Sequence, residues 1–259
     1  MELITVGTGS VAPSAHRTAP CHWVGRTGLK VLLDCGAGSL HRLAEFRLPW
    51  SEVTHVVLSH FHADHFGELP MLVFALRHAT EPPRKEPLVI LGPPGTVRLV
   101  KGLAEGFGKW LLDPGFPIGV LDIRATEPFP LDGEVSLETF PVPHTPESVA
   151  LSITAPEGRL VYTGDTGPSG ELARWASGCD LLLAECSLPE AGAIDIHLTP
   201  ERAGDLARES QARCLVLTHF YPSVETSDPA KGAAARYSGR VLVARDGDRF
   251  TIGAGGTSC

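Results

Sequence analysis

The chain has 259 residues, 43% hydrophobic and 20% charged, and its formal net charge is −8 at pH 7. This composition excludes a disordered or fibrous protein. The acidic excess argues against a broad basic face that holds nucleic acid through its phosphates. No apolar run approaches the roughly 18 residues of a membrane span, and the first residues lack the regions of a signal peptide. We therefore expect a cytoplasmic protein that has no membrane partner.

Strand-like and helix-like segments alternate along most of the chain. Short apolar, β-branched runs predict buried strands near residues 3–6, 30–36, 54–60, 87–92, 159–165, 180–186, 213–219 and 240–246. Helix-like patterns lie near residues 39–47, 67–79, 95–107, 171–178 and 199–210. The last of these begins with Thr199 as its N-cap and Pro200 at the first helical position.

From about residue 120 to residue 161, strands are predicted without helices between them. The dipeptides Asp132-Gly133 and Glu157-Gly158 are typical of hairpin turns. Together, the strand-rich and alternating stretches predict two packed sheets covered by helices. No linker or low-complexity segment interrupts the chain, so we expect one domain over residues 1–259.

The cysteines show neither a C-x-x-C pair nor the spacing of a disulfide framework. We expect buried, reduced thiols at Cys21, Cys35, Cys179, Cys186, Cys214 and Cys259.

Four predicted strands run apolar and then end in a histidine or an acid. These residues are His60, Asp165, Glu185 and His219. Core packing does not require such side chains there. If the strands lie side by side, their ends converge on one edge of the sheets, where α/β proteins commonly bind ligands.

The stretch "SHFHADHFGEL" places His60, His62, Asp64 and His65 within six positions, in the pattern H-x-H-x-D-H. His60 and His62 are two apart, so at the end of an extended segment they point the same way. Asp64 and His65 lie on the turn into the following helix. The two pairs can therefore face two different metal ions. Imidazole and carboxylate without thiolate suit Zn²⁺, and also Mn²⁺ or Fe²⁺.

This motif resembles the signature of the metallo-β-lactamase superfamily, and the resemblance extends from "TVGTGS" to "RVLVARDGDRFTI". It implies an α+β fold, a four-layer αβ/βα sandwich of two mixed β-sheets flanked by helices. It also implies two divalent metal ions, most simply zinc, with Asp165 bridging them. The implied ligands are His60, His62 and His144 for the first ion, and Asp64, His65 and His219 for the second.

Two such ions, about 3.5–4 Å apart, would clamp a bridging hydroxide and neutralise charge on the scissile group. They would also make the pocket locally positive although the chain is acidic. An anionic phosphodiester is then a sensible substrate. Asp34 resembles a carboxylate of this superfamily that orients either a ligand histidine or the following turn.

The segment from residue 181 to residue 220 resembles the RNase Z-like branch of this superfamily. In that branch a glutamate supports a histidine later in the chain, and Glu185 and His197 occupy the matching positions. A carboxylate that is hydrogen-bonded to an imidazole raises the pKa of the imidazole, so His197 could protonate the leaving oxygen. The expected catalytic residues are therefore Asp64, Glu185 and His197.

The sequence also departs from tRNA-processing members of the branch. Ala184 stands where they have a histidine, "THFYPSVE" lacks their arginine, and no long basic arm is present. The pattern resembles small bacterial metallo-hydrolases, some of which cleave cyclic nucleotides. We therefore favour a phosphodiesterase that acts on a small nucleotide, with a cyclic nucleotide as one candidate. The alternative is tRNA 3′ end processing, for which the substrate is RNA.

Other hypotheses remain open at this point. A lactonase or β-lactamase is compatible with the fold, but the Glu185–His197 pair argues against it. A metal-bound scaffold protein is the non-enzyme alternative. His16 and Arg17, after the first strand, are candidates for contact with a substrate phosphate or are simply surface residues. Dimers are common in the branch, so a homodimer is a further expectation.

Overall fold

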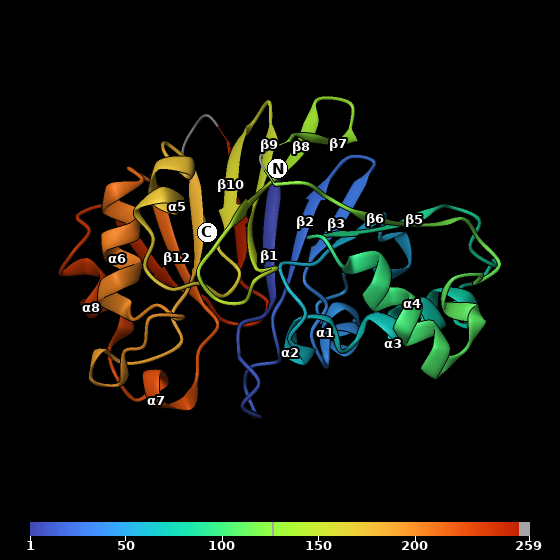
Figure 1. The fold of residues 1–259 in the computed structure, drawn as a ribbon, viewed down its shortest axis with the longest axis horizontal. Coiled ribbons are helices and arrows are strands. Elements are labelled where there is room, and N and C mark those ends of the chain that lie inside the picture. Colours follow the sequence, from blue (N-terminus) through green and yellow to red (C-terminus); the bar gives the residue numbers. More distant parts are fainter. Residues whose placement is uncertain (126, 254–259) are drawn as a thin grey trace.

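Two seven-stranded sheets form the centre of the structure, a computed structural model that describes residues 1–125 and 127–253 (Figure 1). The first sheet has, in spatial order, the strands β14 (Arg249–Thr251), β1 (Glu2–Gly7), β2 (Cys21–Arg26), β3 (Leu29–Leu33), β4 (His55–Val57), β5 (Leu88–Gly92) and β6 (Ile118–Asp122). The second has β7 (Phe129–Asp132), β8 (Val135–Pro141), β9 (Val149–Ala155), β10 (Gly158–Tyr162), β11 (Leu181–Glu185), β12 (Cys214–Thr218) and β13 (Arg240–Val243).

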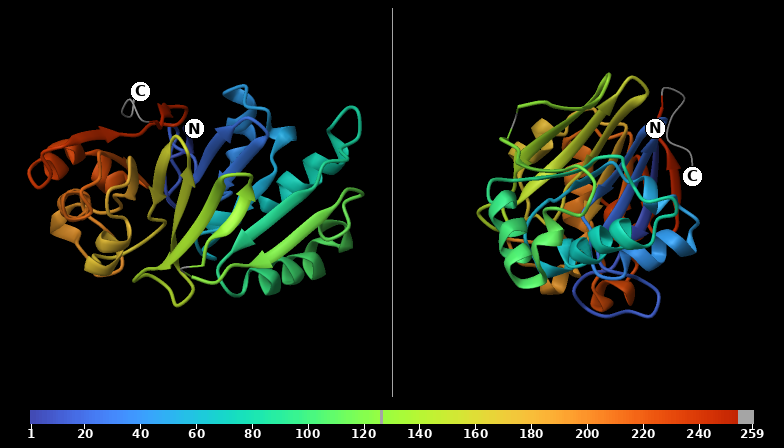
Figure 2. Two further views of the ribbon diagram at one scale, coloured as in Figure 1. Left: turned by 90° about the horizontal axis from the view of Figure 1, so that it is seen from above. Right: turned by 90° about the vertical axis from the view of Figure 1, so that its right-hand side faces the viewer.

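The two sheets share one pairing pattern. In the first, β14, β1, β2 and β3 pair antiparallel and β3, β4, β5 and β6 pair parallel. In the second, β7 to β10 pair antiparallel and β10 to β13 pair parallel. Figure 2 shows the red strand β14 beside the dark blue β1, so the first sheet joins both ends of the chain.

Helices cover the outer face of each sheet. On the first sheet lie α1 (Ser39–Glu45), α3 (Leu69–His78) and α4 (Thr96–Phe107). On the second lie α5 (Gly170–Trp175), α6 (Pro200–Glu209) and α8 (Pro229–Ala234). The short helices α2 (Ala63–Phe66) and α7 (Pro222–Glu225) follow β4 and β12. The expected α+β sandwich, with two mixed sheets flanked by helices, is confirmed.

Apolar side chains fill three layers. The central layer joins the two sheets, with Leu33 and Val57 from the first packing near Leu151 and Leu183 from the second. The outer two layers seat the helices on their sheets. Because both faces of the parallel strands are buried, these strands read in the sequence as continuous apolar runs.

Several local predictions are confirmed. Thr199 caps α6 by accepting a hydrogen bond from the Arg202 backbone N–H at 3.2 Å, and Pro200 takes the first helical position. The hairpins at Asp132-Gly133 and Glu157-Gly158 join β7 to β8 and β9 to β10. The five cysteines of the described residues are free and buried, whereas Cys259 lies outside those residues. No helix in the described ranges has the length and apolar character needed to cross a membrane.

The strands β2 and β14 are absent from the sequence-based prediction, and β7 was indicated only by the turn at Asp132-Gly133. β2 reads CHWVGR, and its His22 and Gly25 interrupt the apolar pattern. Its pairing with β1 and β3 along its length makes it a strand. Here tertiary pairing overrides a weak local preference.

Truncating Leu151 to alanine should lower the free energy of unfolding by about 2–5 kcal/mol, because it leaves a cavity in the central layer. Leu121→Ala is the matched control. That side chain is 44% exposed at the end of β6, so the same deletion should cost less than about 0.5 kcal/mol. Urea unfolding of the two variants measures both values, and equal losses would contradict the assignment of the central layer.

Candidate metal centre

The polar residues predicted at strand ends lie together in the structure. His60 and Asp165 follow β4 and β10, Glu185 ends β11, and His219 follows β12. These strands belong to the parallel halves of the two sheets, so their carboxyl ends meet at one edge of the sandwich. Side chains from both sheets thereby reach a common site.

The first ligand group comprises His60, His62, His144 and Asp165, each of which offers one ligand atom within 4.8 Å of the others. His144 Nε2 lies 3.1 Å from His62 Nδ1 and 3.7 Å from Asp165 Oδ2. His60 Nε2 lies 3.9 Å from the same oxygen. Ligands held at about 2.1 Å by a tetrahedral ion lie about 3.4 Å apart, so these spacings suit one metal ion.

The second ligand group comprises Asp64, His65 and His219. The Nε2 atoms of His65 and His219 are 3.3 Å apart, and His219 Nε2 lies 3.7 Å from Asp64 Oδ2. Asp165 Oδ1 lies 3.3 Å from His65 Nε2 and 3.2 Å from His219 Nε2. The two oxygens of Asp165 thus face different groups, which is the geometry of a bridging carboxylate.

Hydrogen bonds behind the rings set the tautomers of the histidines. Ser59 Oγ donates to Asp34 Oδ2 at 2.8 Å, so it accepts from His60 Nδ1 at 3.0 Å. His144 Nδ1 donates to the Ile196 carbonyl at 3.0 Å.

The second sheet repeats this arrangement with other residues. Ser187 Oγ donates to Glu185 Oε2 and therefore accepts from His219 Nδ1 at 2.9 Å. With the proton on Nδ1, each of these rings directs a bare Nε2 lone pair into the site.

The converging atoms fit a cation. His60 Nε2 and Asp165 Oδ1 are buried and have no hydrogen-bond partner among the described residues. Buried acceptors that face one another without a donor are costly. Divalent ions would satisfy all of them, so the donor set fits two metal ions.

The titration of two histidines agrees with this electrostatic environment. Burial, together with the charge of His65, lowers the pKa of His60 to about 3, which keeps it as the neutral imidazole that a metal requires. Burial also opposes charge on His65, but the carboxylates of Asp165 and Asp34 outweigh it and raise the pKa of His65 well above its usual value. Positive charge is therefore favoured at this point of the site.

Asp34 is completely buried behind the second ligand group. Its Oδ2 accepts from His65 Nδ1 at 2.7 Å and from the Tyr162 hydroxyl at 2.8 Å, while Oδ1 accepts from the Ser59 backbone N–H at 2.7 Å. Burial alone would raise its pKa, yet the charge and hydrogen bond of His65 lower it. The predicted role behind a ligand histidine is thus matched by direct contact. Its φ of 59° is an uncommon left-handed conformation for aspartate.

Glu185 and His197 form the predicted pair. His197 Nδ1 lies 2.9 Å from Glu185 Oε1, which also accepts from the Thr166 backbone N–H at 2.7 Å. The His197 side chain is 11% exposed and that of Glu185 is fully buried. The His197 ring centre lies 4.8 Å from that of His144, so the pair stands directly beside the first ligand group.

Sequence patterns did not single out four side chains of this site: Ser59, Ser187, Tyr162 and Tyr221. Ser59 immediately precedes the H-x-H-x-D-H motif, and Ser187 follows Glu185 by two residues, so their positions offered a signal. Tyr162 reaches Asp34 from the other sheet, and no local pattern indicates that contact. The Tyr221 ring lies 6.0 Å from that of His219 and 6.4 Å from that of His197.

Arg17 is engaged in structural contacts. Its Nη1 donates to Thr8 Oγ1 at 2.5 Å and to the Ala244 carbonyl at 2.6 Å, and its Nε pairs with Glu225. The guanidinium also lies 4.5 Å from the centre of the Phe220 ring. These contacts fix the segment after β1 against the segment that carries His219. His16 lies exposed on the surface.

A family model described as the metallo-beta-lactamase superfamily matches residues 17–219. The chain belongs to this superfamily. It is accordingly a metallo-hydrolase, and the fold and the two ligand groups imply that it binds divalent metal ions. The resemblance drawn from the H-x-H-x-D-H motif is confirmed.

Similar proteins include some that are named as RNase Z, which supports an RNase Z-like branch of the superfamily. Ribonuclease Z of Mycobacterium bovis is 28% identical over 282 residues, covering 97% of this chain and 98% of that protein. The metallo-beta-lactamase fold protein YhfI from Bacillus subtilis matches 96% of this chain and 98% of its own, with a TM-score of 0.81 and 23% identity. The structure of the short form of human tRNase Z matches 97% of this chain and 99% of its own, with a TM-score of 0.77 and 24% identity.

Asp34→Asn should weaken metal binding by about 10–100-fold, the usual effect of losing a carboxylate behind a ligand histidine. The amide keeps the shape of the side chain but removes the charge that holds the proton on His65 Nδ1. Calorimetric titration of metal into the metal-free protein measures the affinity. Asp205→Asn, at an exposed ion pair on α6, is the matched control and should bind metal like the wild type. Equal affinities in all three proteins would contradict the role of Asp34.

Proposed function

We propose that this superfamily member is a dinuclear-metal phosphodiesterase that cleaves a small, nucleotide-containing phosphodiester. The observation that carries the proposal is the buried Glu185–His197 pair beside the first ligand group, to which Asp165 belongs. Such a pair supplies a proton to a leaving alkoxide, which phosphodiester cleavage requires.

The site residues would divide between two ions. His60, His62 and His144 would hold the first, Asp64, His65 and His219 the second, and Asp165 both. Imidazole and carboxylate ligands without thiolate favour zinc, with manganese or iron also compatible. Such ions supply a water of lowered pKa and neutralise charge on the phosphate.

His197 would act as the general acid. Burial disfavours its charged form, but the hydrogen bond and the charge of Glu185 outweigh burial and raise the pKa of His197 above its usual value. The protonated ring then donates Nδ1–H to Glu185 Oε1 and keeps its Nε2 proton for the leaving oxygen. The bonds that Glu185 accepts from Thr166 and Ser187 fix the orientation of the pair.

Two features favour a small substrate. The net charge of −8 gives the surface little general attraction for a long polyanion. After His219 and Phe220, the chain continues with Tyr221 and Pro222, so the arginine expected of tRNA-processing members is missing there. The Tyr221 ring fills the space beside His219 and His197 instead.

Cleavage of precursor tRNA is the second candidate, and the relatives named Ribonuclease Z favour it. The alignment with the Mycobacterium bovis protein extends over 282 positions, more than the 259 residues of this chain, so that protein contains segments with no counterpart here. The lack of a long basic arm therefore still argues against RNA as the substrate.

His197→Ala should slow cleavage of a nucleotide phosphodiester by about 10²–10⁴-fold, because a sugar alkoxide leaves poorly without a proton. Bis(p-nitrophenyl) phosphate has a good leaving group, so its cleavage should fall far less in the same variant. Steady-state rates on the two substrates measure the difference. His41→Ala, on the exposed side of α1, is the control and should keep both rates. An equal loss on both substrates would indicate that His197 does not act as a general acid.

With metal added, the wild-type protein should cleave 2′,3′-cyclic nucleotides with a higher kcat/KM than a precursor tRNA carrying a 3′ trailer. Asp64→Ala removes a ligand of the second group and should abolish cleavage of both. Product analysis by chromatography and gel electrophoresis compares the two substrates. A preference for the tRNA would reverse the order of the two candidates, and no cleavage of any phosphodiester by the metal-loaded protein would refute both.

A further inference from the structure

A hollow of about 410 Å³ lies between α4 of the first sheet and the loop after β8, which also carries His144. Arg98 lines it from α4 and Glu147 lines it from the loop that carries His144. Between them lie apolar surfaces, chiefly those of Pro94, Pro146 and Val149. The volume is within the range of small-ligand sites.

Residues that line the hollow are tied to both histidine-bearing segments of the first ligand group. Glu147 follows His144 by three residues, and the Val149 backbone N–H donates to the Ser59 carbonyl at 3.0 Å. Arg98 also lines a second hollow of about 340 Å³, whose other wall is Phe61, the residue between His60 and His62.

Close packing fixes the start of α4 against this motif. A Cβ on Gly95 would lie 3.0 Å from the Phe61 ring, and the φ of Gly95 is +111°. A larger residue at that position would displace the ring, so the bare backbone keeps Arg98 next to the metal-binding motif.

The two charged groups of the hollow are available to a ligand. Arg98 is exposed and Glu147 is half-buried. Across residues 1–125 and 127–253, neither side chain has a hydrogen bond or an ion pair with a described residue. A guanidinium and a carboxylate therefore face the same apolar hollow, and neither is neutralised by the protein.

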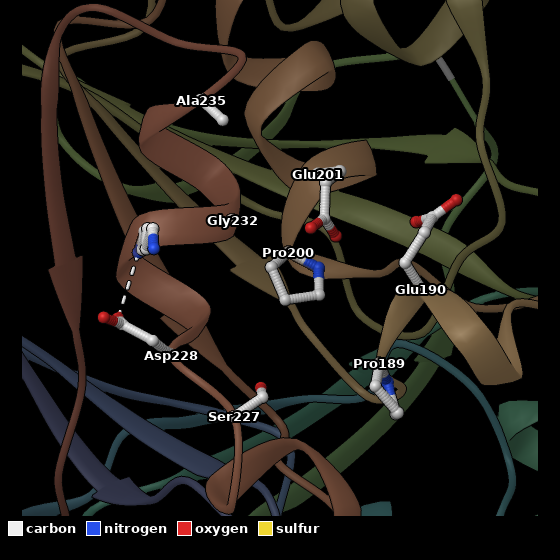
Figure 3. A pocket seen from close by; sticks show the side chains of 9 residues that line it. Pro189, Glu190, Pro200, Glu201, Ser227, Asp228, Gly232 and Ala235 are labelled. Atoms are coloured by element: carbon white, nitrogen blue, oxygen red, sulfur yellow. Dashed lines mark hydrogen bonds between the residues drawn. The ribbon is translucent and has the colours of Figure 1, made fainter.

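Another hollow, between α6 and α8 near the His197 loop, is acidic (Figure 3). Glu190, Glu201 and Asp228 line it, with Lys231 as its one cationic side chain among the described lining residues. Such a surface repels phosphate, so the nucleotide attached to the scissile phosphate would be expected to lie on the Arg98 side.

We infer that the Arg98–Glu147 hollow is a subsite for a guanine base of the substrate, an inference that rests on the proposed function. Guanine presents two acceptors, O6 and N7, to which arginine donates in a bidentate manner. On its adjoining edge, N1–H and the N2 amino group are two donors that one carboxylate can accept together. Adenine, cytosine and uracil cannot satisfy both charged groups in this way. The proline surfaces suit the flat faces of the base.

Equilibrium binding of the four nucleoside 5′-monophosphates to the zinc-loaded protein tests the inference without any cleavage step. The phosphate is common to all four, so differences report the base. GMP should bind about 10-fold more tightly than CMP or UMP, and also more tightly than AMP, as expected for bidentate readout. In Arg98→Gln and in Glu147→Gln, the preference for GMP should fall to about 2-fold or less, while the affinity for CMP stays unchanged.

Lys101→Gln and Glu105→Gln are matched controls, because they remove one charge of each sign from exposed positions on α4 outside the hollow. Both should keep the full preference for GMP. Equal affinity for the four nucleotides, or a GMP preference that persists in both Arg98→Gln and Glu147→Gln, would overturn the subsite. Cleavage of phosphodiesters without base preference would leave the proposed function standing and refute the subsite alone. Selective GMP binding by a protein that cleaves no phosphodiester would support the subsite and refute the proposed function.

Discussion

The buried carboxylate of Asp34 is the constraint on which the rest of the site depends. A charge with no exposure to water must be satisfied entirely by the protein, or the fold loses several kcal/mol. Asp34 is satisfied by Ser59 and His65 from its own sheet and by Tyr162 from the other. The position of the two sheets and the orientation of the metal-facing imidazoles are therefore determined together, by one set of hydrogen bonds.

Glu185 plays the corresponding part in the second sheet. Like Asp34, it is a buried acid that accepts from a serine, and that serine accepts in turn from a histidine of the site. Glu185 additionally binds His197, whereas Asp34 additionally binds a ligand histidine directly. Their places in the sheets differ, because Asp34 follows β3, where antiparallel pairing changes to parallel, whereas Glu185 ends β11, one strand beyond the corresponding strand β10. Under the proposed function, Asp34 would support metal binding and Glu185 would also support proton transfer.

The sequence predicted the parts of the site that local spacing or family context encodes. Four of the predicted ligands lie within six consecutive positions: His60, His62, Asp64 and His65. The other three each lie in a segment typical of the superfamily: His144, Asp165 and His219. The partners behind the ligands, Tyr162 above all, depend on contacts between sheets, which no pattern within one segment records.

The same distinction holds for the fold. Buried parallel strands can be recognised in the sequence as apolar runs, whereas β2 depends on its pairing with β1 and β3 for its conformation. The hollow between Arg98 and Glu147 is formed by segments 49 residues apart in the chain, so no local sequence pattern could predict it either.

The separation of the ligands between the sheets has a mechanical consequence. In each ligand group, residues that follow β4 in the first sheet meet residues carried by the second sheet. Neither sheet alone offers enough atoms to hold an ion, so a bound metal behaves as a cross-link between the two halves of the sandwich. Any motion that slid one sheet against the other would have to break metal–ligand bonds, and the loaded site would tie the rigidity of the whole molecule to its ability to react.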